Sequence, residues 1–376
     1  MNIYRYPSES AEVRISAIEN RGLVFKDEDY ANVKHILEEV RENKDTALIK
    51  YINRFDSPDL TKESLQVTDK EFEAAEKNVE KGFMQSLKRA VSQIETFHRQ
   101  QLSKSWIKTD RPGTFLGQLV NPVDAAGIYV PGGKGGNTPL VSSVLMGAIP
   151  AAIAGVRQIA MVTPSRKDGS INPHLLVAAK KVGVNAVYKV GSAWAIAALA
   201  YGTETIPKVD VIVGPGNIYV TLAKKIVAGT VGIDMTAGPS EILIIADDTA
   251  NPEFTAADLL SQAEHDPLAS AILVTTSQQT AETVKGAVKE QIKSLGRKEI
   301  AEESLEKYGA ILVVPDLEVA IEVANKIAPE HLELQIKDPF EYMGRIRNAG
   351  AIFMGHYTPE PVGDYIAGPN HVLPTA

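Results

Sequence analysis

A glutamine and a histidine stand three residues apart at the end of a predicted helix, in Gln262-Ala263-Glu264-His265-Asp266. Side chains at this spacing share one face of a helical turn, so the amide oxygen and the imidazole could bind one metal ion. The sequence contains no cysteine, so such an ion must be held by His, Asp, Glu or amide oxygen. The alternative interpretation is an ordinary helix end, where a histidine complements the helix dipole.

An acid and an imidazole are adjacent in Glu330-His331, between a predicted helix that Pro329 ends and a predicted strand. A carboxylate beside an imidazole at the start of a strand is a plausible pair for abstracting a proton from a substrate. An ordinary charged turn is the alternative interpretation.

A segment rich in glycine and proline, residues 363–371, contains Asp364 and His371. Its composition indicates a tight loop, and the two side chains offer an oxygen and a nitrogen ligand. Together with Gln262 and His265 they would form a ligand set without sulfur, which suits zinc or manganese. The alternative is a surface turn that binds nothing.

Two further segments, residues 132–137 and 214–217, are rich in glycine and follow predicted strands. Neither has the spacing of a dinucleotide fingerprint or of a phosphate-binding P-loop. The helix predicted to begin at about Asn217 would offer backbone N–H groups to an anion or a cofactor. A plain turn is the alternative for both segments.

The elements that must position these residues alternate after Leu116, where short β-rich runs are followed by helical segments. This alternation predicts an α/β fold with two Rossmann-like lobes, whose parallel-rich sheets are flanked by helices. Ligands of such folds bind at the carboxyl ends of strands. Before Leu116, apolar residues recur at helical spacing over residues 27–55, and a capping box at Thr68 begins a second predicted helix, residues 69–101.

The length of 376 residues suits two compact domains. We expect an N-terminal helical arm over residues 1–25 and a discontinuous α/β domain formed by residues 26–126 and 241–376. A Rossmann-like domain, residues 127–240, would be inserted into it. The candidate metal ligands and the acid–base pair would belong to the discontinuous domain.

The net charge of −8 argues against a nucleic-acid partner or an anionic membrane, because either would need a basic face. No apolar run reaches the ~18 residues that span a bilayer, and the first residues lack the pattern of a signal peptide. The expectation is a cytoplasmic protein with neither a membrane nor a nucleic acid as partner.

With these residues in view, the chain resembles the histidinol dehydrogenase family from about residue 120 onward. The matching runs occur in the order found in the family, and their combination is very specific. They are GIYVPGG (127–133), AIAALAYGTETIPKVD (195–210), IVGPGNIYVTLAKK (212–225), GIDMTAGPSEILIIAD (232–247), DLLSQAEHD (258–266), IAPEHLEL (327–334) and GDYIAGPNHVLPT (363–375).

The resemblance implies a zinc ion bound by Gln262, His265 and Asp364, and a catalytic acid–base pair formed by Glu330 and His331. The implied reaction is the four-electron oxidation of L-histidinol through histidinaldehyde to L-histidine, at the end of histidine biosynthesis. Zinc would orient and polarise the substrate, and two hydrides would pass to NAD. A homodimer is also implied.

The resemblance further implies that NAD is contacted by Tyr129 and Asn217. The side chains implied to bind the substrate are Ser240, Gln262, His265, His331, Asp364 and His371.

The chain departs from the family pattern in two places. Family members often carry a glutamine that contacts NAD where this chain has Trp194, which cannot supply an amide and either stacks on a ligand or packs internally. Family members also continue past the LPT run into a C-terminal tail, which supplies a substrate-contacting glutamate and a further zinc-binding histidine. That tail is absent from the 376 residues, so three zinc ligands are expected within them.

Two other functions remain open at this point. The first is a zinc- and NAD-dependent alcohol dehydrogenase of the same fold that acts on another substrate, such as a sulfonated diol. The second is a non-catalytic protein that binds a metal or a nucleotide. The presence of both Glu330 and His331 argues against the second alternative, while Ser240 and His371 favour histidinol over a diol.

Overall fold

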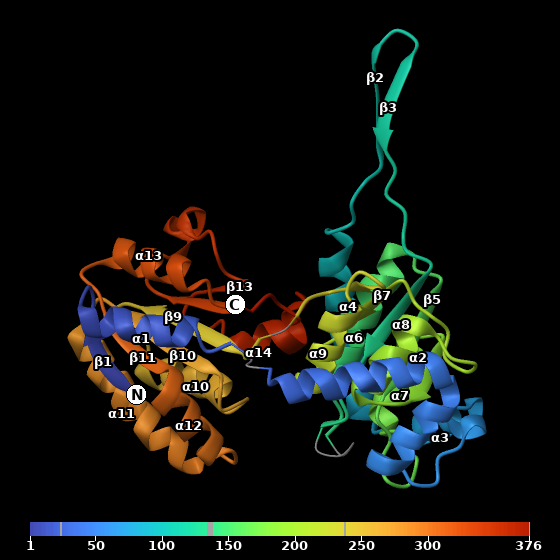
Figure 1. Ribbon diagram of the computed structural model, residues 1–376. Coiled ribbons are helices and arrows are strands. Elements are labelled where there is room, and N and C mark those ends of the chain that lie inside the picture. Colours follow the sequence, from blue (N-terminus) through green and yellow to red (C-terminus); the bar gives the residue numbers. More distant parts are fainter. Residues whose placement is uncertain (23–24, 134–137, 237, 376) are drawn as a thin grey trace. The chain divides into compact units, whose positions relative to one another are not determined.

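The computed structural model describes residues 1–22, 25–133, 138–236 and 238–375 (Figure 1). The chain forms two compact units, each with its own parallel sheet. Unit 1 consists of Met1–Val24, Ala237–Gly363 and Leu373–Ala376, and unit 2 of Phe25–Thr236 and Asp364–Val372. The predicted α/β class with two Rossmann-like lobes is confirmed.

Unit 1 is built on a six-stranded sheet in the order β1-β11-β10-β9-β12-β13, and each neighbouring pair of strands is parallel. The inner strands are buried along nearly their whole length, as expected for a sheet covered on both faces. The strands are β1 (Asn2–Arg5), β9 (Glu241–Ala246), β10 (Ser270–Thr275), β11 (Gly309–Val313), β12 (His331–Gln335) and β13 (Ala351–Met354).

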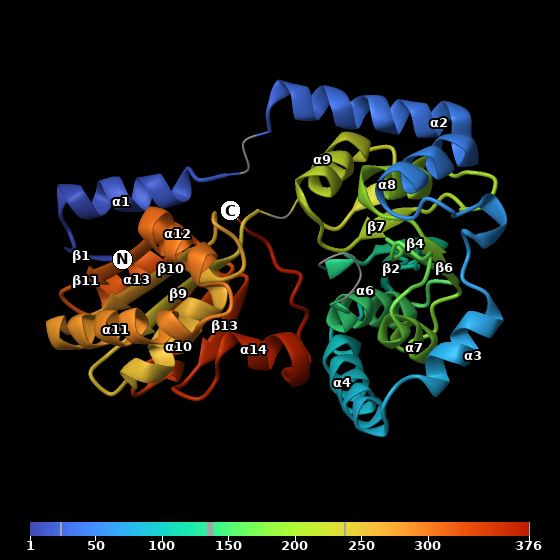
Figure 2. The ribbon, with the colours of Figure 1, turned by 90° about the horizontal axis from the view of Figure 1, so that it is seen from below.

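Helices cover both faces of this sheet (Figure 2). One face packs against α1 (Glu9–Glu19) and α13 (Leu317–Ile327). The other face packs against α10 (Pro252–Ala263), α11 (Gln278–Gln291) and α12 (Lys298–Tyr308). A short helix, α14 (Glu360–Val362), and a π-helical turn, Gly363–Ala367, follow β13.

Unit 2 has a five-stranded parallel sheet in the order β6-β5-β4-β7-β8. Helices α8 (Ser192–Tyr201) and α9 (Ile218–Val227) pack on one face together with α2 (Asp27–Phe55). The opposite face packs against α3 (Asp69–Lys77), α4 (Lys81–Arg99), α6 (Val141–Ala154) and α7 (Pro173–Lys181). The strands are β4 (Ala125–Tyr129), β5 (Gln158–Thr163), β6 (Ala186–Lys189), β7 (Val211–Val213) and β8 (Gly232–Ile233).

The observed packing corrects the expected domain assignment in two ways. Residues 1–25 are not an arm, because β1 pairs with β11 and α1 buries Ala11, Ile15 and Ile18 in unit 1. Residues 26–126 pack with unit 2 rather than with the later lobe, since α2 buries its apolar side against α8 and α9. An amphipathic pattern predicts that a helix has a buried face but does not identify the partner of that face.

Two elements before Ala125 also differ from expectation. The helix predicted over residues 69–101 is two helices, α3 and α4, which are separated at Asn78–Glu80. The chain then forms an antiparallel hairpin that the sequence analysis did not predict, β2 (Trp106–Arg111) and β3 (Thr114–Gln118). Figure 1 shows this hairpin projecting from the rest of unit 2.

Within the described ranges, no helix combines the length and the apolar character that a bilayer-spanning segment requires.

Candidate active site

The candidate site residues of unit 1 gather at the amino ends of its parallel strands. Ser240 immediately precedes β9, His265 lies in the connection before β10, and Glu330 immediately precedes β12. Parallel strands begin at the same edge, and the register pairs Ser270 with Glu241 and His331 with Ile242. These residues stand in the connections that lead from helices into strands, and so at the amino edge of the sheet rather than at the carboxyl edge where ligands are expected.

The Glu330-His331 pair follows a sharp reversal after α13. Ala328 adopts the left-handed conformation, with φ of 54°, and Pro329 prevents the helix from continuing. The chain then enters β12 beside β9, which buries Glu330 (7% exposed) and His331 (4% exposed). The structure thus favours a buried acid–imidazole pair over an exposed charged turn.

Backbone geometry fixes the tautomer of His331. Its Nδ1 lies 2.9 Å from the backbone carbonyl oxygen of Glu241. A carbonyl only accepts hydrogen bonds, so Nδ1 carries the proton in the neutral ring and Nε2 holds the basic lone pair. Nε2 lies 4.0 Å from a carboxylate oxygen of Glu360, which is itself buried.

Two acids of this site, Glu241 and Glu360, were missed by the sequence analysis. Glu241 follows Ser240 directly, and Glu360 begins α14 between two prolines, shortly before Asp364. An acid next to a residue already singled out is the signal that could have identified Glu241. Glu360 has no comparable signal, because only β13 and the turn after it bring this residue back to His331.

Gln262 lies in the last turn of α10 and is 1% exposed. Its side-chain oxygen has no hydrogen-bond partner among the described residues, although buried polar atoms are normally paired. His265 follows one turn later, where its backbone N–H donates to the Gln262 carbonyl oxygen at 3.0 Å, and it is exposed. A buried amide oxygen without a protein partner, beside an accessible imidazole, fits two ligands of a metal ion.

The third expected ligand belongs to the other unit. The backbone of Asp364 lies in the π-helical turn Gly363–Ala367, and its side chain lies outside what the structure describes. No group of three or more His, Asp or Glu side chains with metal-binding proximity occurs among the described residues. That search covers neither the amide of Gln262 nor the side chain of Asp364.

His371 is half-buried in a loop that is anchored on unit 2. The side-chain amide of Asn370 donates to the backbone carbonyl of Met146 at 2.9 Å. Gly368, with φ of +107°, approaches α4 so closely that a Cβ there would lie 2.6 Å from the carbonyl oxygen of Gln93. These contacts explain why glycine is required at position 368 and fix the loop on unit 2.

In unit 2 the candidate residues do lie at carboxyl ends of strands. Tyr129 ends β4, and its hydroxyl accepts a hydrogen bond from the backbone N–H of Ser192 at 3.2 Å. Burial raises the pKa of Tyr129 to about 12, so the hydroxyl is neutral at physiological pH. Gly214, after β7, has no room for a side chain, since a Cβ would lie 2.2 Å from the Tyr129 carbonyl oxygen.

Asn217 is the N-cap of α9, and its side-chain oxygen accepts from the N–H groups of Tyr219 and Val220, both at 3.1 Å. The free N–H groups expected at this helix start are therefore partly occupied by the residue that precedes them. A buried lysine, Lys224, donates to the Gly214 carbonyl at 2.9 Å and pairs with Asp234, which fixes the loop before the helix. Of the other glycine-rich segment, residues 134–137 lie outside the described ranges.

The surroundings of Trp194 favour internal packing over stacking on a ligand. It is 6% exposed and stacks with both Tyr51 and Phe55 of α2, at centroid distances of 5.5 Å. Its ring therefore forms part of the packing between α8 and α2.

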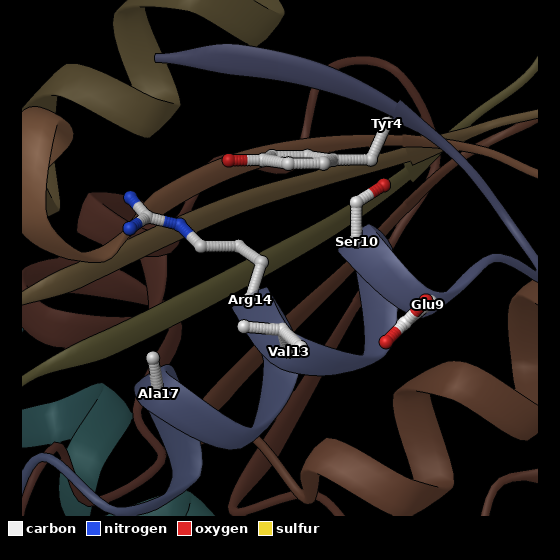
Figure 3. Close-up of a pocket in the computed structure, with 6 residues that line it drawn as sticks. All are labelled: Tyr4, Glu9, Ser10, Val13, Arg14 and Ala17. Carbon is white, nitrogen blue, oxygen red and sulfur yellow. The ribbon is translucent and has the colours of Figure 1, made fainter.

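A shallow hollow elsewhere on unit 1 is a poor candidate for the site. It lies between β1 and α1 and is lined by Tyr4, Glu9, Ser10, Val13, Arg14 and Ala17 (Figure 3). The guanidinium of Arg14 donates to the backbone carbonyls of Glu306 and Gly309, so it holds the fold together at this point. None of the candidate residues lines this hollow.

Known proteins resemble this chain over nearly its whole length. The family model described as histidinol dehydrogenase matches residues 20–376. The histidinol dehydrogenase of Desulfotalea psychrophila is 55% identical over 368 residues, which are 98% of this chain and 85% of that protein. That of Oleidesulfovibrio alaskensis is 56% identical over 343 residues, 91% of this chain and 79% of that protein.

A solved structure agrees with the sequence comparison. The crystal structure of histidinol dehydrogenase from Elizabethkingia anophelis superposes with a TM-score of 0.93 at 40% identity, covering 100% of this chain and 85% of that one. The chain belongs to the histidinol dehydrogenase family.

Proposed function

We propose that this chain oxidises L-histidinol through histidinaldehyde to L-histidine, with two NAD as hydride acceptors and one zinc ion per chain. The observation that carries the proposal is the buried pair Glu330-His331, in which the Glu241 carbonyl leaves Nε2 of His331 as the basic nitrogen. The membership of the family supports the substrate.

His331 would act as the base in both oxidations. In the first, the O–H proton of the alcohol moves to Nε2, the electron pair of the carbinol C–H bond leaves as hydride to NAD, and a C=O bond forms. Glu330 would then take a proton from a water molecule whose oxygen adds to the aldehyde carbon, while His331 returns its proton to the aldehyde oxygen, which gives the hydrate and leaves Nε2 basic again. The hydrate loses a second hydride to NAD and one O–H proton to Nε2, which gives the carboxylic acid, and this acid ionises to the carboxylate near neutral pH.

Gln262, His265 and Asp364 would hold the zinc. The buried amide oxygen of Gln262, for which the described part of the chain offers no partner, fits this role within unit 1. When bound, zinc would supply a Lewis acid without redox chemistry of its own. The substrate-binding site would be lined by the same three side chains together with Ser240 and His371.

NAD would bind unit 2 through Tyr129 and Asn217. Both stand at the carboxyl edge of a parallel sheet, which is where Rossmann-like folds take dinucleotides. Tyr129 has a neutral hydroxyl. Because Gly214 has no side chain, its backbone can lie against the Tyr129 carbonyl at the same edge of the sheet.

We also propose that the chain forms a homodimer in the cytoplasm. Support for the dimer comes from the hairpin β2–β3, which exposes Trp106, Ile107, Phe115 and Leu116. Exposure of several large apolar side chains on a two-stranded ribbon is unfavourable in water, and a partner that covers them removes this cost. Light scattering of the purified chain would give the mass directly.

The decisive experiment measures NADH formed per L-histidinol consumed, with excess NAD and added zinc. A ratio near two is expected, because both oxidations occur at one site. A sulfonated diol is the matched alternative substrate. NADH from the diol and none from histidinol would overturn the proposal in favour of the related dehydrogenase activity.

A further inference from the structure

Glu241 contacts both residues of the acid–base pair through three different groups. Its carboxylate accepts a hydrogen bond from the Glu330 backbone N–H at 3.0 Å. Its own backbone N–H donates to the Glu330 carboxylate at 3.2 Å, and its carbonyl receives Nδ1 of His331 at 2.9 Å. The orientation of both side chains is thus tied to the position of one residue at the start of β9.

Glu241 is held in turn by Arg21, the residue that follows the C-cap of α1. The guanidinium donates to the Glu241 carboxylate at 2.5 Å, and the two side chains are 4% and 3% exposed. Two further contacts fix the arginine, to the backbone carbonyls of Ile18 at 2.7 Å and Leu268 at 3.1 Å. Arg21 therefore has a defined place, and α1 contributes to the site through it.

The charges explain why an arginine is needed there. Glu241 and Glu330 are both buried, and the carboxylate of each accepts a hydrogen bond from the backbone N–H of the other. A buried carboxylate is stable only with a compensating charge or full hydrogen bonding, and removing the partner leaves an uncompensated charge. Without Arg21, the carboxylate of Glu241 would reorient or gain a proton, and its bond to the Glu330 N–H would change.

We propose that Arg21 and Glu241 form a positioning pair, which holds the Glu241 carbonyl against Nδ1 of His331 and fixes the orientation of Glu330. Neither residue touches the reacting atoms in this proposal. It rests on the proposed roles of Glu330 and His331, and it adds the N-terminal helix α1 to the elements on which catalysis depends.

The test compares Arg21→Met with Arg14→Met in the full chain. Both arginines are associated with α1 and donate to backbone carbonyls, but Arg14 contacts Glu306 and Gly309 and lies away from Glu241. We expect Arg21→Met to lower kcat roughly 10- to 100-fold with KM changed less than about threefold, as found for partners that orient a catalytic group. Arg14→Met should keep kcat within about twofold. Glu241→Gln, which preserves volume, provides a second variant if Arg21→Met does not fold.

A double variant separates charge compensation from loss of packing. In Arg21→Met/Glu241→Gln neither charge remains, so we expect kcat to recover at least about fivefold relative to Arg21→Met alone. Additive losses in the double variant would overturn the idea of a charge-compensated pair.

A spectroscopic readout is independent of the substrate. Nitrogen-15 NMR of labelled histidine should show His331 as the Nδ1–H tautomer in the wild type, assigned by its loss in His331→Asn. Both variants of the pair keep the Glu241 backbone carbonyl, so Nδ1 should stay protonated, but Arg21→Met and Glu241→Gln should move the ring-nitrogen resonances of His331 as the start of β9 shifts, and Arg14→Met should not. Unmoved His331 resonances together with an unchanged kcat would refute the proposal. Moved resonances in a protein that does not oxidise histidinol would refute the proposed function instead and leave the positioning pair intact.

Discussion

The side-chain amide of Gln335 joins the carboxyl groups of Asp258 and Glu333 inside unit 1. Asp258 lies on α10, one turn before Gln262, and Glu333 lies on β12, two residues after His331. Gln335 donates to both carboxyl groups at 2.8 Å. This pair, a buried Glu333 and a half-buried Asp258, therefore joins the helix of the candidate zinc ligand to the strand of the acid–base pair.

Glu333→Gln should make the stability of the protein less dependent on pH. Burial raises the pKa of Glu333 well above its ordinary 4.5, and the nearby Asp258 carboxylate raises it further. The folded state then binds more protons than the unfolded state above pH 4.5, so the free energy of unfolding falls as the pH rises from there through the folded pKa. The amide cannot ionise, so the variant should lose this slope. Thermal midpoints from pH 5 to 8 check this.

The control for that series is Glu299→Gln, which changes an exposed acid of α12 in the same unit. It should follow the wild-type pH dependence. If Glu333→Gln also follows the wild type, the pair does not carry the proton that its burial implies.

Gln262→Leu should weaken zinc binding at least tenfold. Leucine matches the volume of the buried glutamine but removes the side-chain oxygen that has no protein partner in the described structure. Even groups that only orient metal ligands contribute 10- to 100-fold to affinity in typical sites, so a ligand should contribute no less. Competition with a chromophoric chelator measures the dissociation constant of zinc.

Gln291→Leu is the matched control, because Gln291 lies on α11 of the same unit and bonds to Glu253 at the surface. Its zinc affinity should equal that of the wild type. Equal affinity in both variants would remove Gln262 from the ligand set.

The sequence predicted the alternating α/β elements of both lobes well, because buried parallel strands are short apolar runs and the helices between them are amphipathic. It misassigned α2, since its apolar residues predict burial without naming α8 as the partner. It also missed the role of β1 as an edge strand, whose partner β11 follows some three hundred residues later. Pairing over such a separation leaves no local signal.

The residues of the candidate site also divide into those that have a local sequence signal and those that have none. Gln262, His265, Glu330 and His331 stand out by residue type and spacing, and the structure places all four at one edge of the unit 1 sheet. Glu360 and Arg21 reach that edge only through tertiary structure, and nothing in their local sequence indicates it. Their contribution follows from burial and from the atoms they face.

Trp194→Phe should leave the KM for NAD within about twofold of the wild type while it lowers stability by roughly 1–3 kcal/mol. The indole is packed between Tyr51 and Phe55, so a smaller ring loses contacts between α8 and α2. Trp194→Ala should cost about 3–5 kcal/mol, because the cavity is larger. Urea unfolding and NAD titration at fixed histidinol check both. A large rise in KM for the stable Phe variant would instead indicate stacking on the cofactor.

Glu330→Gln should separate the two oxidations. The proposed roles give His331 the proton of each hydride transfer and Glu330 only the hydration step between them. The amide is nearly isosteric and can still accept the Glu241 backbone N–H that now bonds to the carboxylate at 3.2 Å. The first NADH should form at close to the wild-type rate, and the second should slow by on the order of 10²- to 10⁴-fold, the usual contribution of a general base.

Stopped-flow recording of NADH from excess enzyme and limiting L-histidinol distinguishes the steps. The wild type should release two NADH per histidinol, and Glu330→Gln should release one quickly and the other slowly. Histidinaldehyde offered directly should show only the slow phase. His331→Asn is the counterpart, because loss of the base that serves both transfers should slow the first NADH as much as the second. A Glu330→Gln variant that slows both phases equally would mean that Glu330 acts in hydride transfer, through its contact with His331 at 3.7 Å, and not in hydration.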